Sequence, residues 1–199
     1  MRAALAAIML TLAVPLCADE YLGAAVISHP TVDRFSVCFN HSCETVVTQA
    51  LSGDEWQRVS ALLQPAAPTA AAERRAIGHA LALMEQIVGN HTGTQRDKGG
   101  NLRGFGEPGQ LDCIDESTNA STYLYLLESA GLLQHHTLEA RATRFGLFVG
   151  MPHTTAVIRE TASGQRYAVD TWFFDNGEPP PIIELSAWKS GWDPAEAEP

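Results

Sequence analysis

Three residues of this 199-residue chain have the types and the order that nucleophilic cysteine catalysis requires: Cys113, His153 and Asp170. In such chemistry a thiol attacks a carbonyl, a histidine takes and returns the proton, and a carboxylate fixes the histidine ring. Cys113 precedes His153 by 40 residues, and His153 precedes Asp170 by 17. These residues are the candidate catalytic group, provided that the surrounding elements bring them together.

Cys113 is expected in the first turn of a helix over residues 112–130, with Asp112 as its N-cap. The positive end of the helix dipole would stabilise a thiolate there. The carboxylates of Asp112, Asp115 and Glu116 favour the thiol instead, so a nucleophilic Cys113 needs a histidinium partner. The alternative is that Cys113 is a buried, inert side chain.

Three successive strands are expected after this helix, over residues 141–149, 153–160 and 165–173. His153 opens the second strand and Asp170 lies near the end of the third. A simple ladder about the intervening turn would pair Asp170 with Ala156 or Val157. A bulge, a twist or a different register must therefore bring Asp170 to His153.

Helices are also expected ahead of the cysteine. Ser52 and Glu55 form a capping-box pattern for a helix that ends near Leu63, and Thr69 caps a longer helix that Gly89 is expected to end. Shorter strands are expected at residues 24–28, 35–39 and 182–188.

The order of these residues resembles the transglutaminase-like superfamily, and within it the bacterial transglutaminase-like cysteine proteinases. Leu111–Asp115 is similar to their D-C-x-D nucleophile motif, His153–Val157 to their H-x-x-x-V strand, and Tyr167–Asp170 to their aromatic-x-hydrophobic-D motif. The resemblance covers about residues 90–175. It implies an α+β, papain/transglutaminase-like fold, in which N-terminal helices, with the nucleophile at a helix N-terminus, pack on an antiparallel β-sheet.

The resemblance also implies a mechanism and a substrate class. Cys113 would be the nucleophile, His153 the base and acid, and Asp170 the orienting carboxylate of an acyl transfer on a protein or peptide. A thioester would form and be resolved by water or an amine. The backbone N–H of Cys113 would be one oxyanion donor and Gln110 a second, unless Gln110 is only a loop residue.

No cofactor is required by this chemistry, although some relatives bind calcium through acids beside the nucleophile. Asp112, Asp115 and Glu116 are the possible calcium ligands here, but helix capping explains Asp112 and Asp115 equally well. Ile114 stands where an acid is common in the adhesin-processing members. This difference weakens the analogy in both calcium binding and substrate.

Other functions remain open or are excluded by missing motifs. Arylamine acetyltransferases share the order of cysteine, histidine and acid, but their R-G-G-x-C motif is absent from this sequence. A catalytically inactive binding module is a further alternative. A metal-dependent hydrolase would have to use His135-His136, a predicted loop pair with no further ligands in view. The absence of G-x-S-x-G argues against a serine hydrolase. Residues 104–109 match G-x-G-x-x-G, but the preceding residues carry no strand pattern, so a dinucleotide site is rejected.

The first 18 residues predict a secretory signal peptide cleaved near Ala18, with retention as an anchor or lipidation of Cys17 as alternatives. Export would place the chain in the periplasm or outside the cell, with no stable membrane insertion after cleavage. The net charge of −10, without a basic run, argues against nucleic-acid binding. Residues 19–192 are expected to form one domain, followed by a disordered tail over 193–199; the sequence leaves the oligomeric state open.

In an oxidising compartment, cysteines are expected to form disulfides, so an unpaired thiol requires an explanation. Cys38 and Cys43 are close enough in sequence to form a small-loop disulfide. Together with His41 they could alternatively be three ligands of a zinc site, although no fourth ligand follows at a recognisable spacing. The disulfide would leave Cys113 as the unpaired thiol.

Overall fold

The computed structural model describes residues 26–101, 106–145 and 152–194. Within them the chain forms short and long helices and two antiparallel sheets. In chain order the elements are β1 (Phe35–Phe39), β2 (Thr45–Gln49), α1 (Gly53–Ala61), α2 (Ala70–Thr92), η3 (Thr94–Arg96), α3 (Cys113–Ser129), β3 (His136–Phe145), β4 (Pro152–Glu160), β5 (Arg166–Val169), η4 (Thr171–Phe173), β6 (Ile182–Glu184) and α4 (Leu185–Lys189).

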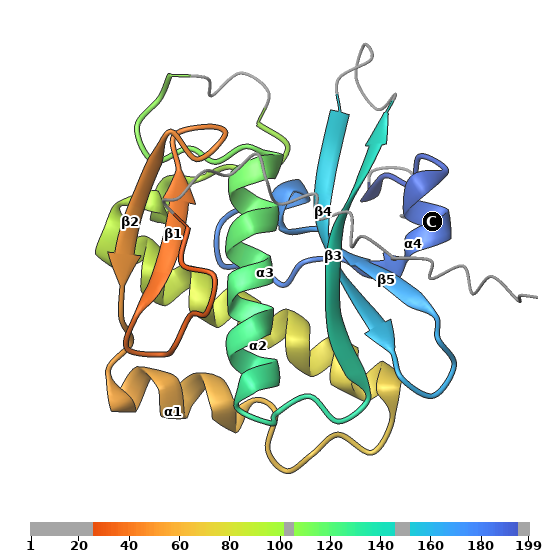
Figure 1. The fold of residues 1–199 in the computed structure, drawn as a ribbon. Coiled ribbons are helices and arrows are strands. Elements are labelled where there is room, and N and C mark those ends of the chain that lie inside the picture. The colour runs from red at the N-terminus through yellow and green to blue at the C-terminus, as the bar shows by residue number, and fades with distance from the viewer. Residues whose placement is uncertain (1–25, 102–105, 146–151, 195–199) are drawn as a thin grey trace, which may run out of the picture.

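The helix α3 is the central element of the fold. The hairpin β1-β2 lies on one side of it and the four-stranded antiparallel sheet, in the order β3-β4-β5-β6, lies on the other (Figure 1). The chain thus has the expected α+β organisation with antiparallel sheets. Because α3 contacts β4 directly, the sheet brings the start of β4 to the first turn of α3.

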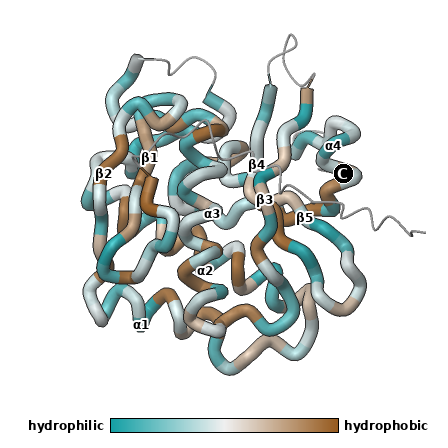
Figure 2. Tube along the Cα trace, viewed as in Figure 1, coloured by the Kyte–Doolittle hydropathy of each residue, from teal (hydrophilic) through white to brown (hydrophobic). Residues whose placement is uncertain are grey.

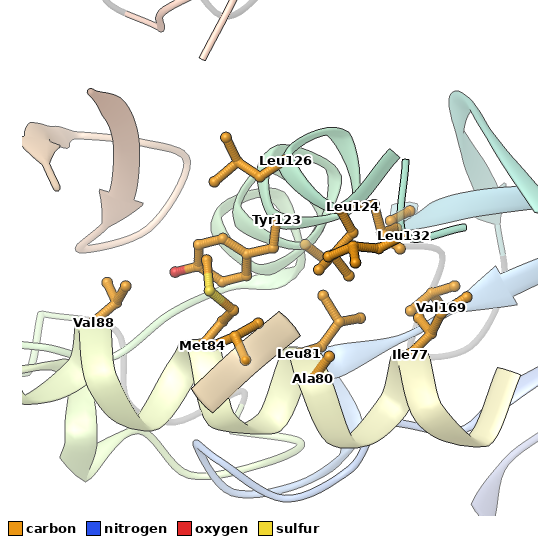
Figure 3. Packing of buried hydrophobic residues seen from close by; sticks show 14 of the residues in the cluster. Ile77, Ala80, Leu81, Met84, Val88, Tyr123, Leu124, Leu126, Leu132 and Val169 are labelled. Atoms are coloured by element: carbon orange, nitrogen blue, oxygen red, sulfur yellow. The ribbon is translucent and has the colours of Figure 1, made fainter. Parts of the chain in front are cut away.

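The main core lies where α2 crosses α3. Figure 3 shows Leu81 and Met84 of α2 facing Tyr123 and Leu124 of α3, and three of these side chains have no exposed surface while Tyr123 keeps 2%. Burying each large apolar side chain stabilises the fold by about 1.5 to 3 kcal/mol. Hydrophobic stretches run along α2 and β1, whereas the connecting loops are more polar (Figure 2). This core fixes α3, and therefore the position of its first residue.

The predicted helix starts are confirmed. Ser52 and Glu55 form the capping box of α1, Thr69 caps α2, and Asp112 caps α3. The predicted end of α2 at Gly89 is wrong, because α2 continues to Thr92 and ends at Gly93, which has a φ of 87°. Gly89 is buried instead: a Cβ there would lie 3.0 Å from the backbone nitrogen of Gln95. Its small size therefore permits close packing and does not stop the helix.

The predicted strands differ from the structure at their ends. β3 begins at His136, five residues before the predicted start, so the prediction of a loop at His136 is wrong. His136 pairs with Glu160 of β4, and the imidazole Nδ1 of this buried histidine lies 2.7 Å from a carboxylate oxygen of Glu73 on α2, which fixes the start of the strand to that helix. β5 ends at Val169 and is followed by the turn η4, and β6 ends at Glu184, where α4 begins.

Some predictions concern residues that the structure does not describe. The signal peptide, residues 24–25 of the strand predicted over 24–28, residues 146–149 of the strand predicted over 141–149, and residues 195–199 of the tail lie outside the described residues. Residues 26–28 are described and are not a strand. Asp193 and Pro194 are described and are half-buried. None of the helices in the described ranges is long and apolar enough to cross a membrane.

Candidate active site

His153 and Asp170 lie in contact at the end of the β4-β5 ladder. Their atoms Nε2 and Oδ2 are 2.7 Å apart, and the side chains are 6% and 1% exposed. The ladder pairs Ala156 with Val169, so the next position places Asp170 opposite Thr155. The predicted pairing of Asp170 with Ala156 or Val157 is therefore wrong by one or two residues.

The register explains how the pair forms without a bulge in these strands. His153 and Thr155 point to the same face of β4, because side chains alternate along a strand. Asp170 is opposite Thr155 and diagonal to His153, and diagonal neighbours are within reach of long side chains. The turn between β4 and β5 sets this register through the hydrogen bond from Glu160 N to the Gln165 carbonyl.

Cys113 is the first residue of α3 and lies against the start of β4. Its Sγ is 3.9 Å from the carbonyl oxygen of Pro152, and the backbone N–H of Thr154 is near enough to lower the pKa of the thiol. Pro152 and Thr154 are the two residues that flank His153. The fold therefore brings the thiol to the backbone on both sides of the histidine. Among the described residues the thiol donates to the Pro152 carbonyl, not to the imidazole.

The electrostatics of this position favour the neutral thiol. Burial raises the pKa of the Cys113 thiol to about 11, and the carboxylates of Asp112 and Asp170 act in the same direction. The backbone N–H groups of Thr154 and Cys113 oppose this shift but do not overcome it. At neutral pH the resting thiol keeps its proton, so nucleophilic attack requires a base to remove it. Because Nε2 of His153 is bound to Asp170, Nδ1 is the ring atom available for that task.

An aromatic and cationic wall surrounds the histidine. The rings of Trp172, Phe173 and Trp188 lie 4.8, 5.6 and 5.6 Å from the His153 ring. The indole Nε1–H of Trp188 donates to Asp170 Oδ2 over 2.6 Å. Arg144 is paired with His153 across β3 and β4, and its guanidinium carbon lies 4.4 Å from the Trp188 ring. These contacts exclude water from the pair of His153 and Asp170.

Asp112 and Asp115 hold the disulfide-linked turn that precedes β2. Cys38 and Cys43 are bonded, which confirms the predicted disulfide and contradicts the zinc alternative, since two of its three ligands are oxidised. Residues 40–43 all have positive φ values, between 53° and 67°. This left-handed turn directs N–H groups at the two carboxylates: Asp115 accepts from His41 and Cys43 over 2.8 and 2.6 Å.

These contacts bear on the predicted calcium ligands. Asp112 accepts from Ser42 and from the amides of Ile114 and Asp115, as a helix cap does. Glu116 is buried and interacts electrostatically with Glu85, Asp97 and Asp115. Within the described ranges no group of three or more acids, histidines or cysteines is arranged to hold a metal ion. The three acids therefore serve as caps and buried groups, and calcium binding stays a prediction.

Gln110 is buried and used by the neighbouring loop. Its Nε2 donates to the Arg96 carbonyl over 3.0 Å, and its Oε1 accepts from Asn101 and from the Lys98 amide. The side chain thus ties the loop after η3 to the start of α3. Its predicted role as an oxyanion donor would require the amide to leave these contacts.

Three carboxyls are buried together behind the nucleophile: Glu85, Asp97 and Glu116. Burial raises the pKa of Glu85 to about 8 and that of Asp97 to about 7, and it holds the pKa of Glu116 well above its usual range. Mutual repulsion acts in the same direction, and Asp97 and Glu116 share a side-chain hydrogen bond. Asp97 also accepts from the amide of Leu111 over 2.7 Å, which fixes the segment before Cys113.

The sequence alone did not single out Arg144, Trp188 or the carboxyls of Glu85 and Asp97. Arg144 shares β3 with the charged residues Glu139 and Arg141, so its charge alone does not distinguish it in the sequence. No local signal indicates Trp188, because its contact with Asp170 depends on the path of the chain through β6 and α4.

Comparisons with family models, with curated proteins and with solved structures found no match to this chain.

Proposed function

We propose that this chain is an exported cysteine-dependent amide hydrolase or acyl transferase that acts through Cys113, His153 and Asp170. The main support is the position of Cys113: the first residue of α3 lies against Pro152 and Thr154, which flank the histidine bound to Asp170. The thiol of α3 thus lies beside the backbone of β4 that carries His153, and the imidazole of His153 is bound to the carboxylate that follows β5. This is the set of groups that acyl transfer through a thioester requires.

The proposed reaction has two halves. His153 Nδ1 removes the thiol proton as Sγ attacks the carbonyl carbon of an amide, and the imidazolium then protonates the leaving amine. A thioester on Cys113 remains, and water or an amine attacks its carbonyl carbon with His153 again as base. The carbon–sulfur bond then breaks, the acid or the new amide leaves, and the imidazolium returns the proton to Sγ. Asp170 keeps Nε2 bound throughout, so Nδ1 remains the reacting nitrogen.

The backbone N–H of Cys113 is the proposed oxyanion donor. Asp112 caps the amides of Ile114 and Asp115 and leaves the amide of Cys113 outside that cap. This amide also lies at the positive end of α3, where developing negative charge is stabilised.

The fold agrees with a papain/transglutaminase-like assignment, which we include in the proposal. The nucleophile starts a helix, the helix packs on an antiparallel sheet, and the histidine and the acid follow on adjacent strands in that chain order. The Cys38–Cys43 disulfide is typical of proteins from oxidising compartments and supports a periplasmic or secreted location. A protein or peptide is the proposed substrate.

A catalytically inactive binding module is the second candidate, and one observation favours it. The pKa of Cys113 is raised to about 11, and its thiol donates to a backbone carbonyl. A buried, protonated thiol of this kind is inert unless a base engages it.

Alkylation by iodoacetamide at neutral pH separates the two candidates. The label on Cys113 is located by peptide mass spectrometry, and the rate is compared between the wild type and His153→Ala. His79→Ala is the matched control, because His79 is exposed on α2. The enzyme proposal expects rapid labelling that falls in His153→Ala alone. Slow labelling that is equal in all three proteins would support the binding module.

A further inference from the structure

Asp170 Oδ2 is the acceptor of two N–H groups, not one. His153 Nε2 lies 2.7 Å from this oxygen and Trp188 Nε1 lies 2.6 Å from it. Both donors are buried, and Trp188 has no exposed surface. With two donors on one oxygen, the orientation of the carboxylate is fixed.

Trp188 is itself held by a charged side chain. Arg144 donates through Nη1 to the Trp188 carbonyl and to the Trp192 carbonyl, and its guanidinium lies over the face of the Trp188 ring. Arg144 and His153 are direct partners across β3 and β4, so their side chains share a face of the sheet. Contacts therefore run from Arg144 to Trp188, from Trp188 to Asp170 and from Asp170 to His153, which is the strand partner of Arg144.

The burial of Arg144 supports a role beyond packing. The residue is 4% exposed, and among the described residues its Nε and Nη2 atoms have no hydrogen-bond partner. A buried guanidinium with unsatisfied donors is costly, and such groups call for an explanation. Here the cost is offset by the negative face of the Trp188 ring and by the nearby charge of Asp170.

We propose that Trp188, braced by Arg144, is a positioning residue of the catalytic group: its indole N–H holds the Asp170 carboxylate in the orientation that fixes the His153 ring. The inference rests on the proposed function for its catalytic meaning. Trp188 does not touch the reacting atoms, and it acts on them through Asp170 and His153. The role requires the N–H group as well as the ring.

Trp188→Phe tests this role, because it removes the indole N–H and keeps an aromatic ring for Arg144 and His153. Trp56→Phe is the matched control, because it makes the same change on α1, a helix that carries none of the candidate catalytic residues. Each protein is alkylated with iodoacetamide on Cys113 across a range of pH. Trp188→Phe is expected to lower the rate about tenfold and to move the pH profile, and Trp56→Phe to change neither. A folded Trp188→Phe protein with an unaltered rate and profile would overturn the inference.

A second measurement holds even if Trp188→Phe does not fold. The indole N–H of Trp188, assigned by NMR, should exchange slowly in the wild type and shift in Asp170→Asn, but not in Cys113→Ala. An indole N–H whose chemical shift is the same in Asp170→Asn as in the wild type contradicts the inference. Failure of the proposed function gives a different result: His153→Ala would leave the alkylation of Cys113 unchanged, whatever the indole signal does.

Discussion

Raising the pH is expected to destabilise the buried region beside the start of α3, because the carboxyls of Glu85, Asp97 and Glu116 are buried together there and repel one another when ionised. For Glu85 the pKa rises from 4.5 to about 8 on folding. At low pH the group is protonated in both states and has no effect. As the pH rises above 4.5 the unfolded chain loses its proton while the folded chain keeps it, so the free energy of unfolding falls until the pH passes about 8.

The size of the effect follows from this window. Between about pH 5.5 and about pH 8.5, Glu85 alone is expected to lower the free energy of unfolding by about 3 kcal/mol. Asp97 and Glu116 act in the same direction but share protons with Glu85, so their effects do not add. Urea unfolding at a series of pH values measures the sum.

In the wild type the Gly177 amide donates a hydrogen bond to Glu85 Oε2 over 3.0 Å. Glu85→Gln mimics the protonated carboxyl, and its amide oxygen can still accept this hydrogen bond. The variant should lose much less stability over the same interval, whereas the exposed control Glu184→Gln should behave like the wild type. The loosening should appear as faster hydrogen exchange at Leu111, whose amide Asp97 binds. A wild-type stability that is flat or rises with pH, or an equal loss in Glu85→Gln, would refute the reasoning.

Three further substitutions have defined outcomes. Asp115→Ala leaves the amides of the disulfide-linked turn without an acceptor and should lower the free energy of unfolding by about 3 to 5 kcal/mol; a loss below about 1 kcal/mol in urea unfolding contradicts this. Replacing Cys38 and Cys43 by alanine removes a short-loop disulfide and should cost about 2 kcal/mol in the same assay, and equal stability would count against the role of the turn. Asp170→Asn should slow the alkylation of Cys113 at least about 100-fold while the protein stays folded, and an unchanged rate would remove Asp170 from the catalytic group.

Local signals in the sequence predicted much of the fold. The N-caps at Ser52, Thr69 and Asp112 depend on contacts within one turn of helix, so the sequence is sufficient to place them. The disulfide could be predicted for the same reason, since its cysteines are close in the chain. The ends of elements were harder, because they depend on tertiary contacts. Gly89 does not end α2, since its role is to let another segment pack closely.

The candidate site was predictable in its residue types but not in its geometry. The meeting of His153 with Asp170 depends on a register that a four-residue turn shifts by one or two positions. The hydrogen bond from Trp188 to Asp170 depends on α4, a helix that lies within the residues where a strand was expected. The unusual left-handed turn could not be predicted either, because residues 40–43 have no glycine and their conformation is stabilised by carboxylates far along the chain.

Formation of an acyl-enzyme on Cys113 tests the central claim most directly. p-Nitrophenyl acetate is a small acyl donor whose leaving group is coloured, so an acyl-enzyme that forms faster than it hydrolyses produces an initial burst. The account predicts a burst of about one equivalent and an acetyl group on Cys113 that hydroxylamine removes, with no burst in Cys113→Ser and a strongly reduced one in His153→Ala. Acetylation that is absent from Cys113, or a burst that is equal in His153→Ala, would contradict it.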